Sequence, residues 1–513
     1  MSDVSAPPAQ WFGHPRGLYV LFFAEMWERF SYYGMRALLV FYLTKHFLFS
    51  DQQASGLYAT YASLVYLMPV LGGLVADRYL GFRRAVIFGA VLLCVGHLGM
   101  AYEGFGATQD ADGVVTRDAF AMNVLYAALA FIIVGVGFLK PSISSMVGQL
   151  YGPDDERRDG GFTIFYMGIN LGSMVASLAC GYLGETYGWA YGFGLAGFGM
   201  LLGLVTFARG TPLLGDAGRA PDEMASGQPR SGLRRSDVLI YLGGLATVAV
   251  AWVLIQSQAL VGALLSWTSI LAVAGILWFS LARCTPIERD RMLAVLVLIA
   301  VSVVFWALFE QAGSSLNLFA DRNVDREIFG MTVRASQLQS LNPMFIILLA
   351  PLFAALWPAL ARRGWEVSTP LKFAIAVLQV GLGFAALVYG ASTAVDGRVA
   401  LGWLVLAYLL HTTGELCLSP VGLSMVTRLS VPRVVGLMMG VWFLSSSVAH
   451  YVAGLIAAMA SVQDGAGAAA ADSLSVYTDT FLLVAQVAGA VGVAMLVVSP
   501  LLRRLAHEGQ RQS

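Results

Sequence analysis

Long apolar runs, separated by short polar segments, are the dominant pattern of this chain. A membrane-spanning helix needs about 20 apolar residues in a row, and the runs are long enough to predict fourteen such helices. Backbone amides that face lipid have no water to bond, so each span must be a helix or a break buried within the bundle. The predicted helices cover residues 17–44, 53–77, 84–102, 119–148, 161–184, 188–208, 237–256, 258–282, 289–318, 337–361, 370–390, 400–427, 434–460 and 477–502.

Two segments divide this series of spans. Residues 209–236 are rich in Gly, Pro and charge and are predicted to be a cytoplasmic linker. It would separate an N-terminal six-helix bundle at 1–208 from a C-terminal six-helix bundle with a cytoplasmic tail at 284–513. An extra helical pair at 237–283 has almost no ionisable side chain within its spans and is expected to be scaffold that faces lipid. The predicted fold class is therefore an all-α polytopic membrane protein.

Basic residues give the expected orientation. When loops are assigned alternately from a cytoplasmic N-terminus, 22 of the 31 Lys and Arg residues fall on the cytoplasmic side and 6 on the outer side. This bias predicts that both termini are cytoplasmic. The expected location is the inner (plasma) membrane of a bacterium. The remaining three, Arg29, Arg36 and Lys140, lie within predicted helices.

Composition narrows the class of function. Hydrophobic residues make up 58% of the chain and charged residues 12%, whereas soluble domains average about 25% charged residues. A net charge of zero argues against a nucleic-acid partner. The chain has neither an H-E-x-x-H motif nor a GxxxxGK[ST] loop, and its four cysteines are far apart. No catalytic site, metal site or bound cofactor is therefore expected.

The first predicted helix carries several charges on one face. Glu25, Glu28, Arg29 and Arg36 follow the 3.6-residue repeat of a helix, with Tyr32 on the same stripe. A charge at the bilayer centre costs at least about 2.5 kcal/mol on insertion scales. These groups must therefore face partners or a wet cavity, and a functional role is the first hypothesis.

Other polar residues are predicted at membrane depth. Lys140 needs a carboxylate partner, which Glu310 or Glu415 in the second half of the chain could supply, as could the acids of the first helix. Asn170 and Asn342 add amide groups. Three histidines are expected within helices, as packed or capping side chains rather than proton relays: His97, His411 and His450.

The segment GGLVADRYLGFRRA, from Gly72 to Ala85, resembles the loop signature of the major facilitator superfamily. The resemblance implies that its glycines allow close packing and that its Asp and Arg side chains clasp neighbouring helix ends on the cytoplasmic side. The residues concerned are Gly72, Gly73, Asp77, Arg78, Gly81, Arg83 and Arg84. It also implies the fold of that superfamily for the two six-helix bundles.

A narrower resemblance concerns the first helix. The residues from Glu25 to Tyr33 are similar to the ExxERFxYY motif of the proton-dependent oligopeptide transporter family. The segments FLKPSISSMVG, FYMGINLGSM and GELCLSPVGLSMVTRLSV resemble signatures of its fourth, fifth and tenth core helices. The resemblance implies a proton-coupled symporter that imports di- and tripeptides by alternating access, with the peptide bound between the bundles.

The same resemblance implies a role for each matching residue. Glu25, Glu28 and Arg29 would couple protons. Arg29, Arg36 and Lys140 would hold the substrate carboxylate, and Asn170, Asn342 and Glu415 would hold the amine. Arg36 with Glu310, and Lys140 with Glu415, would be gating salt bridges. The pocket aromatics would be Tyr32, Tyr33, Tyr66, Trp306 and Trp442.

One position departs from the animal branch of the family, which has a histidine in the second helix. The corresponding stretch here is Tyr58-Ala59-Thr60-Tyr61, so coupling through that histidine is excluded. The proton would be the coupling ion, and no other cofactor is expected. Expected partners are di- and tripeptides, peptide-like drugs and membrane lipid, with a monomer as the functional unit.

Two alternatives stay open. The same fold and basic residues would suit nitrate, a drug or another organic anion, although an anion without an amine would not need Glu415. A membrane enzyme or a sensor is the alternative from another class. It has little support, because the chain shows neither a nucleophile–base constellation nor a soluble effector domain.

Overall fold

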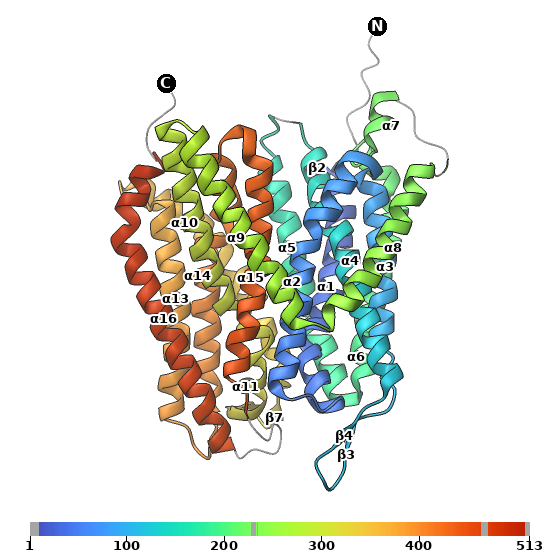
Figure 1. The fold of residues 1–513 in the computed structure, drawn as a ribbon, viewed down its shortest axis with the longest axis vertical. Coiled ribbons are helices and arrows are strands. Elements are labelled where there is room, and N and C mark those ends of the chain that lie inside the picture. The colour runs from blue at the N-terminus through green and yellow to red at the C-terminus, as the bar shows by residue number, and fades with distance from the viewer. Residues whose placement is uncertain (1–9, 153, 227–231, 233, 463–469, 508–513) are drawn as a thin grey trace. The chain divides into compact units, whose positions relative to one another are not determined.

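The computed structural model describes residues 10–152, 154–226, 232, 234–462 and 470–507, and these residues are almost entirely helical (Figure 1). Its α-helices are α1 Arg16–Phe41, α2 Asp51–Val75, α3 Phe82–Met100, α4 Ala119–Gln149, α5 Arg158–Tyr187, α6 Trp189–Gly210, α7 Pro221–Ser226, α8 Arg235–Ile255, α9 Gln258–Arg283, α10 Pro286–Phe309, α11 Ser315–Asn323, α12 Leu341–Arg362, α13 Thr369–Ser392, α14 Leu401–Leu429, α15 Val435–Met459 and α16 Ala470–Leu505.

Short π and 3₁₀ turns and two-residue strands complete the described elements. The turns are η1 Tyr42–His46, η2 Ala76–Leu80, η3 Thr211–Leu214, η4 Glu310–Gly313, η5 Ala335–Ser340 and η6 Pro432–Val434. The strand pairs are β1 Gln10–Trp11 with β2 His14–Pro15, β3 Thr108–Gln109 with β4 Val115–Thr116, β5 Val324–Asp325 with β8 Val399–Ala400, and β6 Glu327–Ile328 with β7 Met331–Thr332. The β3–β4 hairpin extends beyond the ends of α3 and α4 (Figure 1).

Thirteen helices of the described residues are long and apolar enough to cross a membrane. The helix α1 is not among them, although its 26 residues are enough to span the bilayer. It carries the charges predicted at membrane depth, which set it apart from the other spans. With α1 included, the helices correspond one to one to the fourteen predicted spans. The chain is an integral membrane protein.

The described residues form two compact units. The first unit comprises residues 1–38 and 67–256, and the second comprises 39–66 and 257–513. The division passes through α1 and α2, so residues 39–66 are grouped with the second unit. The predicted domain boundaries follow the order of the chain instead, and they stay a prediction.

In the first unit, glycines bring helices into close contact. The helix α3 packs along α4 and α6, and α8 lies along α4. A side chain at Gly89 of α3 would come within 2.6 Å of the carbonyl oxygen of Gly135 in α4. In α6, a side chain at Gly192 would approach the carbonyl oxygen of Cys180 at 2.8 Å. Backbone contact of this kind is typical of membrane helices.

In the second unit, α13 lies between α14 and α16, and α10 packs on α15. The extra helical pair is divided, since α8 belongs to the first unit and α9 to the second, where α9 contacts α10 and α15. Only 22% of the residues in the apolar stretch of each helix are buried. That exposure is what a lipid-facing scaffold needs, and the scaffold role stays a prediction.

Candidate functional site

Glu25, Glu28 and Arg29 form one buried group on α1, here called the α1 cluster. The Arg29 Nε atom lies 2.8 Å from Glu25 Oε1 and 3.0 Å from Glu28 Oε2. All three residues are at most 5% exposed. Glu25 Oε2 and both carboxylate oxygens of Glu28 accept no hydrogen bond from the described residues. The Nε atom of one guanidinium thus forms ion pairs with two carboxylates.

The helical repeat and the packing of α5 explain this geometry. Residues three and four apart on a helix lie above one another, so Arg29 contacts both acids of its own helix. A side chain at Gly172 of α5 would meet the carbonyl oxygen of Met26, so α5 lies directly against α1 here. The Lys140 ammonium group of α4 interacts electrostatically with Glu28. The first unit therefore brings these four predicted residues together.

Arg36 and the two tyrosines lie further along α1. The Arg36 guanidinium carbon lies 5.5 Å from the centroid of the Tyr33 ring, and Tyr32 packs edge-on against Tyr33 at 5.3 Å. Arg36 is 6% exposed. Asn170 of α5 donates a hydrogen bond of 3.0 Å to the Tyr166 carbonyl oxygen in its own helix. The side-chain NH₂ group of Asn170 thus has a hydrogen-bond acceptor in the backbone of its own helix.

The second unit joins two of the residues predicted to bind an amine. The Asn342 side-chain nitrogen, at the start of α12, donates to Glu415 Oε2 at 3.0 Å and to Thr412 Oγ1 at 3.1 Å, both in α14. Glu415 is 8% exposed. This contact holds the carboxylate in place, as an amine-binding group requires.

A cavity of about 270 Å³ in the second unit contains three of the predicted pocket aromatics, and it is here called the aromatic cavity. Apolar walls with a few polar groups are typical of small-molecule sites. The lining residues are Tyr66, Trp306, Glu310, Ser419, Trp442, Phe443, Ser446 and His450.

In this cavity, the structure places a histidine beside a predicted gating residue. His450 Nε2 of α15 lies 3.5 Å from Glu310 Oε1, and the His450 ring stacks on Tyr66 with centroids 4.1 Å apart. Glu310 occupies the first position of η4, whereas the sequence predicted one helix through residues 289–318. The predicted span is confirmed, since residues 286–323 form one candidate membrane span, but apolar periodicity does not distinguish a 3₁₀ turn within it from an α-helix.

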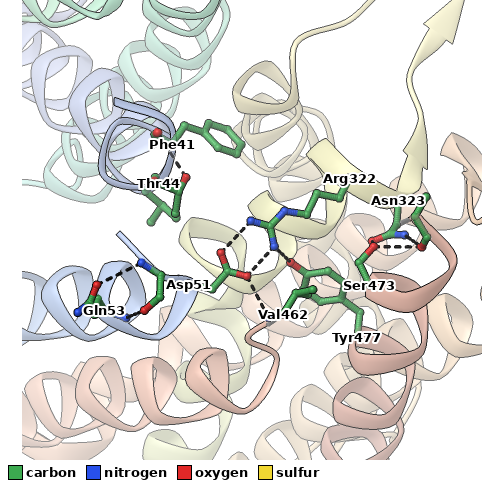
Figure 2. A network of polar contacts seen from close by, with 12 residues as sticks. Phe41, Thr44, Asp51, Gln53, Arg322, Asn323, Val462, Ser473 and Tyr477 are labelled. Atoms are coloured by element: carbon green, nitrogen blue, oxygen red, sulfur yellow. Dashed lines mark hydrogen bonds and ion pairs between the residues drawn. The ribbon is translucent and has the colours of Figure 1, made fainter. Parts of the chain in front are cut away.

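A second charged network of this unit was not predicted (Figure 2). Arg322 of α11 donates to both oxygens of Asp51, at 2.5 and 2.8 Å, and to the Tyr477 hydroxyl at 3.2 Å. The Val462 amide donates to Asp51 Oδ2 at 3.1 Å. We call these four residues the Asp51 anchor. The neighbouring pair of Lys45 and Asp321 is 2.7 Å apart.

No local signal in the sequence could have identified the Asp51 anchor. Asp51 begins α2, so it resembles an ordinary first-turn acid, and Arg322 lies between the predicted spans 289–318 and 337–361. The two residues are 271 positions apart. Only the tertiary fold brings them together, and it thereby ties the start of α2 to α11 and α16 within the second unit.

The loop motif between α2 and α3 holds the linker in place. Arg84 binds Glu223 of α7 at 2.9 Å and Asp237 of α8 at 3.1 Å. Arg83 Nε donates to the Ala217 carbonyl oxygen at 2.7 Å. Gly81 has a φ of +80°, which favours glycine. The other motif residues lie at the end of α2, for Gly72 and Gly73, and in η2, for Asp77 and Arg78.

Two predicted pairs join residues of different units. They are Arg36 with Glu310 and Lys140 with Glu415, and both stay predictions. The roles assigned to the individual residues of the α1 cluster and the aromatic cavity stay predictions too. Among the described residues, no group of three or more His, Cys, Asp or Glu side chains is placed to hold a metal ion.

Comparisons with known proteins give a consistent result. The model of the POT family matches residues 83–472. The chain is 38% identical over 465 residues to the peptide transporter YePEPT of Yersinia enterocolitica, covering 87% of this chain and 88% of that one. It is 35% identical over 503 residues to dipeptide and tripeptide permease A of Erwinia pyrifoliae, covering 97% and 96%.

A solved structure extends the likeness to the fold. A crystal structure of a POT family transporter in complex with a thioalcohol conjugated peptide matches with a TM-score of 0.79 and 30% identity. The match covers 97% of this chain and 98% of that one. It confirms the predicted fold class, an all-α polytopic membrane protein with the major facilitator superfamily fold.

Proposed function

Since this chain belongs to the POT family, we propose that it is a symporter that imports di- and tripeptides together with protons. The relatives named as peptide transporters cover nearly its whole length, and the family is one of transporters rather than enzymes. Peptide-like drugs would enter by the same route, since a POT structure similar to this chain holds a conjugated peptide.

The contact between Asn342 and Glu415 is the observation that carries the peptide assignment. An anion without an amine gains nothing from a buried carboxylate held at 3.0 Å by an amide. A peptide is a zwitterion, and its amino terminus would bind Glu415 while Arg29, Arg36 and Lys140 of the first unit attract its carboxylate. The apolar walls of the aromatic cavity would accept varied side chains, because apolar contact is non-directional.

The α1 cluster supports the proton-coupling step. Protonation of Glu28 would weaken the hold of the carboxylates on Arg29 and Lys140, and positive charge would then be released toward the carboxylate of the peptide. Proton and peptide thereby become linked ligands, each favouring the binding of the other. The movement between inward and outward states would be the rocking of helical bundles that is common in such transporters.

The remaining expectations complete the proposal. The chain would lie in a bacterial inner membrane, and the distribution of its basic residues supports a cytoplasmic location for both termini. It would work as a monomer surrounded by lipid, with the proton as its coupling ion and no bound cofactor. Neither a nucleic acid nor an enzymatic reaction has a part in this function.

Uptake of a labelled dipeptide by purified protein in liposomes, driven by an inward proton gradient, tests the proposal. Unlabelled di- and tripeptides should compete, whereas nitrate and acyl anions should not. Glu415→Ala should lower the affinity for free-amine peptides by about 2 kcal/mol, because a charged hydrogen-bonding partner is lost, and should affect amino-blocked analogues much less.

Glu366→Ala is the matched control, because the Glu366 side chain is exposed on the same unit. Its uptake should equal that of the wild type. Competition by nitrate in place of peptides would favour the alternative anion substrate. Equal losses for free and amino-blocked peptides would contradict an amine site at Glu415.

A further inference from the structure

A cavity of about 570 Å³ at one end of the second unit is lined by several basic side chains, and it is here called the basic cavity. It lies where α10 and α13 begin and where α14 and α16 end, and these four helices pack on one another. Those ends are predicted to be the cytoplasmic ends of their spans. The described residues that line it all differ from those of the aromatic cavity. Its ionisable side chains are Arg291, Lys372, Arg428, Arg503, His507 and Glu366.

Positive charge exceeds negative charge on this lining. Four of the described lining side chains are cations at neutral pH, whereas one, Glu366, is a carboxylate. The Glu366 side chain is 78% exposed and lies 4.0 Å from the Arg503 Nη2 atom, so water screens this pair. Like charges that are gathered at neighbouring helix ends repel one another. An anion inside the basic cavity would relieve that repulsion.

Neutral groups hold two of these cations in place. Arg428 Nη2 of α14 donates a hydrogen bond of 3.3 Å to Thr369 Oγ1 at the start of α13. Lys372 Nζ lies 4.6 Å from the centroid of the Trp357 ring of α12, in a cation–π contact. These two contacts orient the side chains but do not neutralise them. Positive charge is therefore positioned at the wall of the cavity before any ligand binds.

Arg291 supplies a hydrogen-bond donor that lacks an acceptor. It is the sixth residue of α10, and its side chain is half-buried. Its Nε atom is buried and has no hydrogen-bond partner among the described residues. A buried donor without an acceptor lowers the stability of the folded protein. An oxygen atom of an anion bound in the cavity would satisfy it.

The start of α13 adds to this setting. Ser368 and Thr369 line the cavity, and the Ser368 side chain does not cap the helix that follows it. The first N–H groups of a helix have no acceptor within the helix, and its N-terminus carries a partial positive charge. Side-chain cations and a helix N-terminus thus favour the same kind of ligand.

We propose that the basic cavity binds a phosphate group. Arginine suits this ligand, because its planar guanidinium can donate two parallel hydrogen bonds to phosphate oxygens. A volume of about 570 Å³ is within the usual range for small-molecule sites. The phosphate can come from the headgroup of an anionic phospholipid, since basic pockets between helices at the cytoplasmic surface bind such headgroups, or from a soluble phosphate compound. A bound phosphate would join the ends of four helices and so stabilise the second unit.

The melting temperature of the full chain in detergent tests this site, because a ligand that binds only the folded state raises it. Phosphatidylglycerol should raise the melting temperature of the wild type more than phosphatidylcholine does. Arg291→Gln should need about tenfold more phosphatidylglycerol for the same rise, because a charged hydrogen-bond donor is lost. Lys372→Gln, on a different helix, should show the same weakening, so the test does not depend on the folding of one variant.

Arg289→Gln is the matched control. Arg289 is on the same helix, pairs with Asp290 at 3.4 Å and lies outside the described lining of the basic cavity. Residues two positions apart on a helix do not share a face. This variant loses the same charge as Arg291→Gln but should respond to phosphatidylglycerol as the wild type does. Equal weakening in both variants would overturn the site, because general attraction between a basic surface and anionic lipid would then explain the binding.

Inorganic phosphate, compared with chloride at equal ionic strength, separates the two sources of the ligand. A rise in melting temperature with inorganic phosphate that Arg291→Gln lacks would support a site for soluble phosphate compounds. A rise with phosphatidylglycerol alone would support a lipid site. A wild type that responds to neither probe would overturn the proposal. Peptide uptake is not measured in this test, so its failure would leave the proposed function untouched.

Discussion

The α1 cluster and the Asp51 anchor are both buried groups built around one arginine, yet they satisfy their charges differently. In the anchor, Arg322 reaches both oxygens of a single carboxylate, and a hydroxyl and a backbone amide complete the network (Figure 2). In the α1 cluster, Arg29 is shared by two carboxylates through one nitrogen. Three of their four oxygens accept no hydrogen bond from the described part of the chain.

This difference separates a holding contact from a labile one. Neutralising one partner of a buried, fully hydrogen-bonded ion pair strongly lowers the stability of the protein, because the other charge is left uncompensated. When two carboxylates share one cation, neutralising one of them costs less stability, because it also removes the repulsion between the two carboxylates. The anchor is thus suited to fix the fold of the second unit, and the α1 cluster is suited to take up and release a proton.

Neutralising the anchor should have the largest effect on stability. Asp51→Asn leaves Arg322 without its charge partner, and the Arg322 side chain is only 13% exposed. We expect the free energy of unfolding to fall by about 3 kcal/mol, seen as a lower melting temperature in detergent. The double variant with Arg322→Gln should recover part of this loss, because it removes the uncompensated charge.

The comparison would fail if Asp51→Asn melted at the wild-type temperature. In that case, hydrogen bonding to both carboxylate oxygens would not distinguish a structural ion pair from a labile one.

An exposed ion pair should have the smallest effect. Asp155 and Arg157 lie in the loop before α5, with Arg157 Nη2 at 2.7 Å from Asp155 Oδ2. Hydrogen bonds from the Arg157 side chain lower the pKa of Asp155 to about 2. Because this pKa is depressed, any contribution to stability is present above the unfolded-state value and is lost only as the pH falls through about 2.

Water and salt screen such an exposed pair. Asp155→Asn should therefore leave the melting temperature unchanged at every pH between about 5 and 8, well above both pKa values. A melting temperature that drops clearly for this variant within that range would show that charge pairs stabilise this protein regardless of burial.

The sequence predicted the spans well because apolar length is a direct requirement of the bilayer. The ends of the predicted spans differ from the ends of the helices where a helix continues beyond the lipid. The helix α16 begins at Ala470, whereas the predicted span begins at residue 477, because Asp472, Ser473 and Ser475 are polar. Polarity marks the end of the membrane and not the end of a helix.

The candidate site was predictable to the extent that its contacts are local. Glu25, Glu28 and Arg29 meet because of helical spacing alone, so their grouping is confirmed. Asp51 with Arg322, and His450 with Glu310, meet only through tertiary packing. A lone sequence does not encode such long-range pairing in any local pattern, and His450 was accordingly expected to be a packed or capping residue.

The central claim is that Glu28, a buried acid that shares Arg29 with Glu25, couples protons to peptide uptake. Uptake by the Glu28→Gln variant in liposomes tests this claim most directly. The account predicts that this variant loses dipeptide accumulation under an inward proton gradient. It should keep peptide exchange and melt no lower than the wild type, with exposed Glu366→Gln as the control. Accumulation with wild-type magnitude and pH dependence in Glu28→Gln would contradict it.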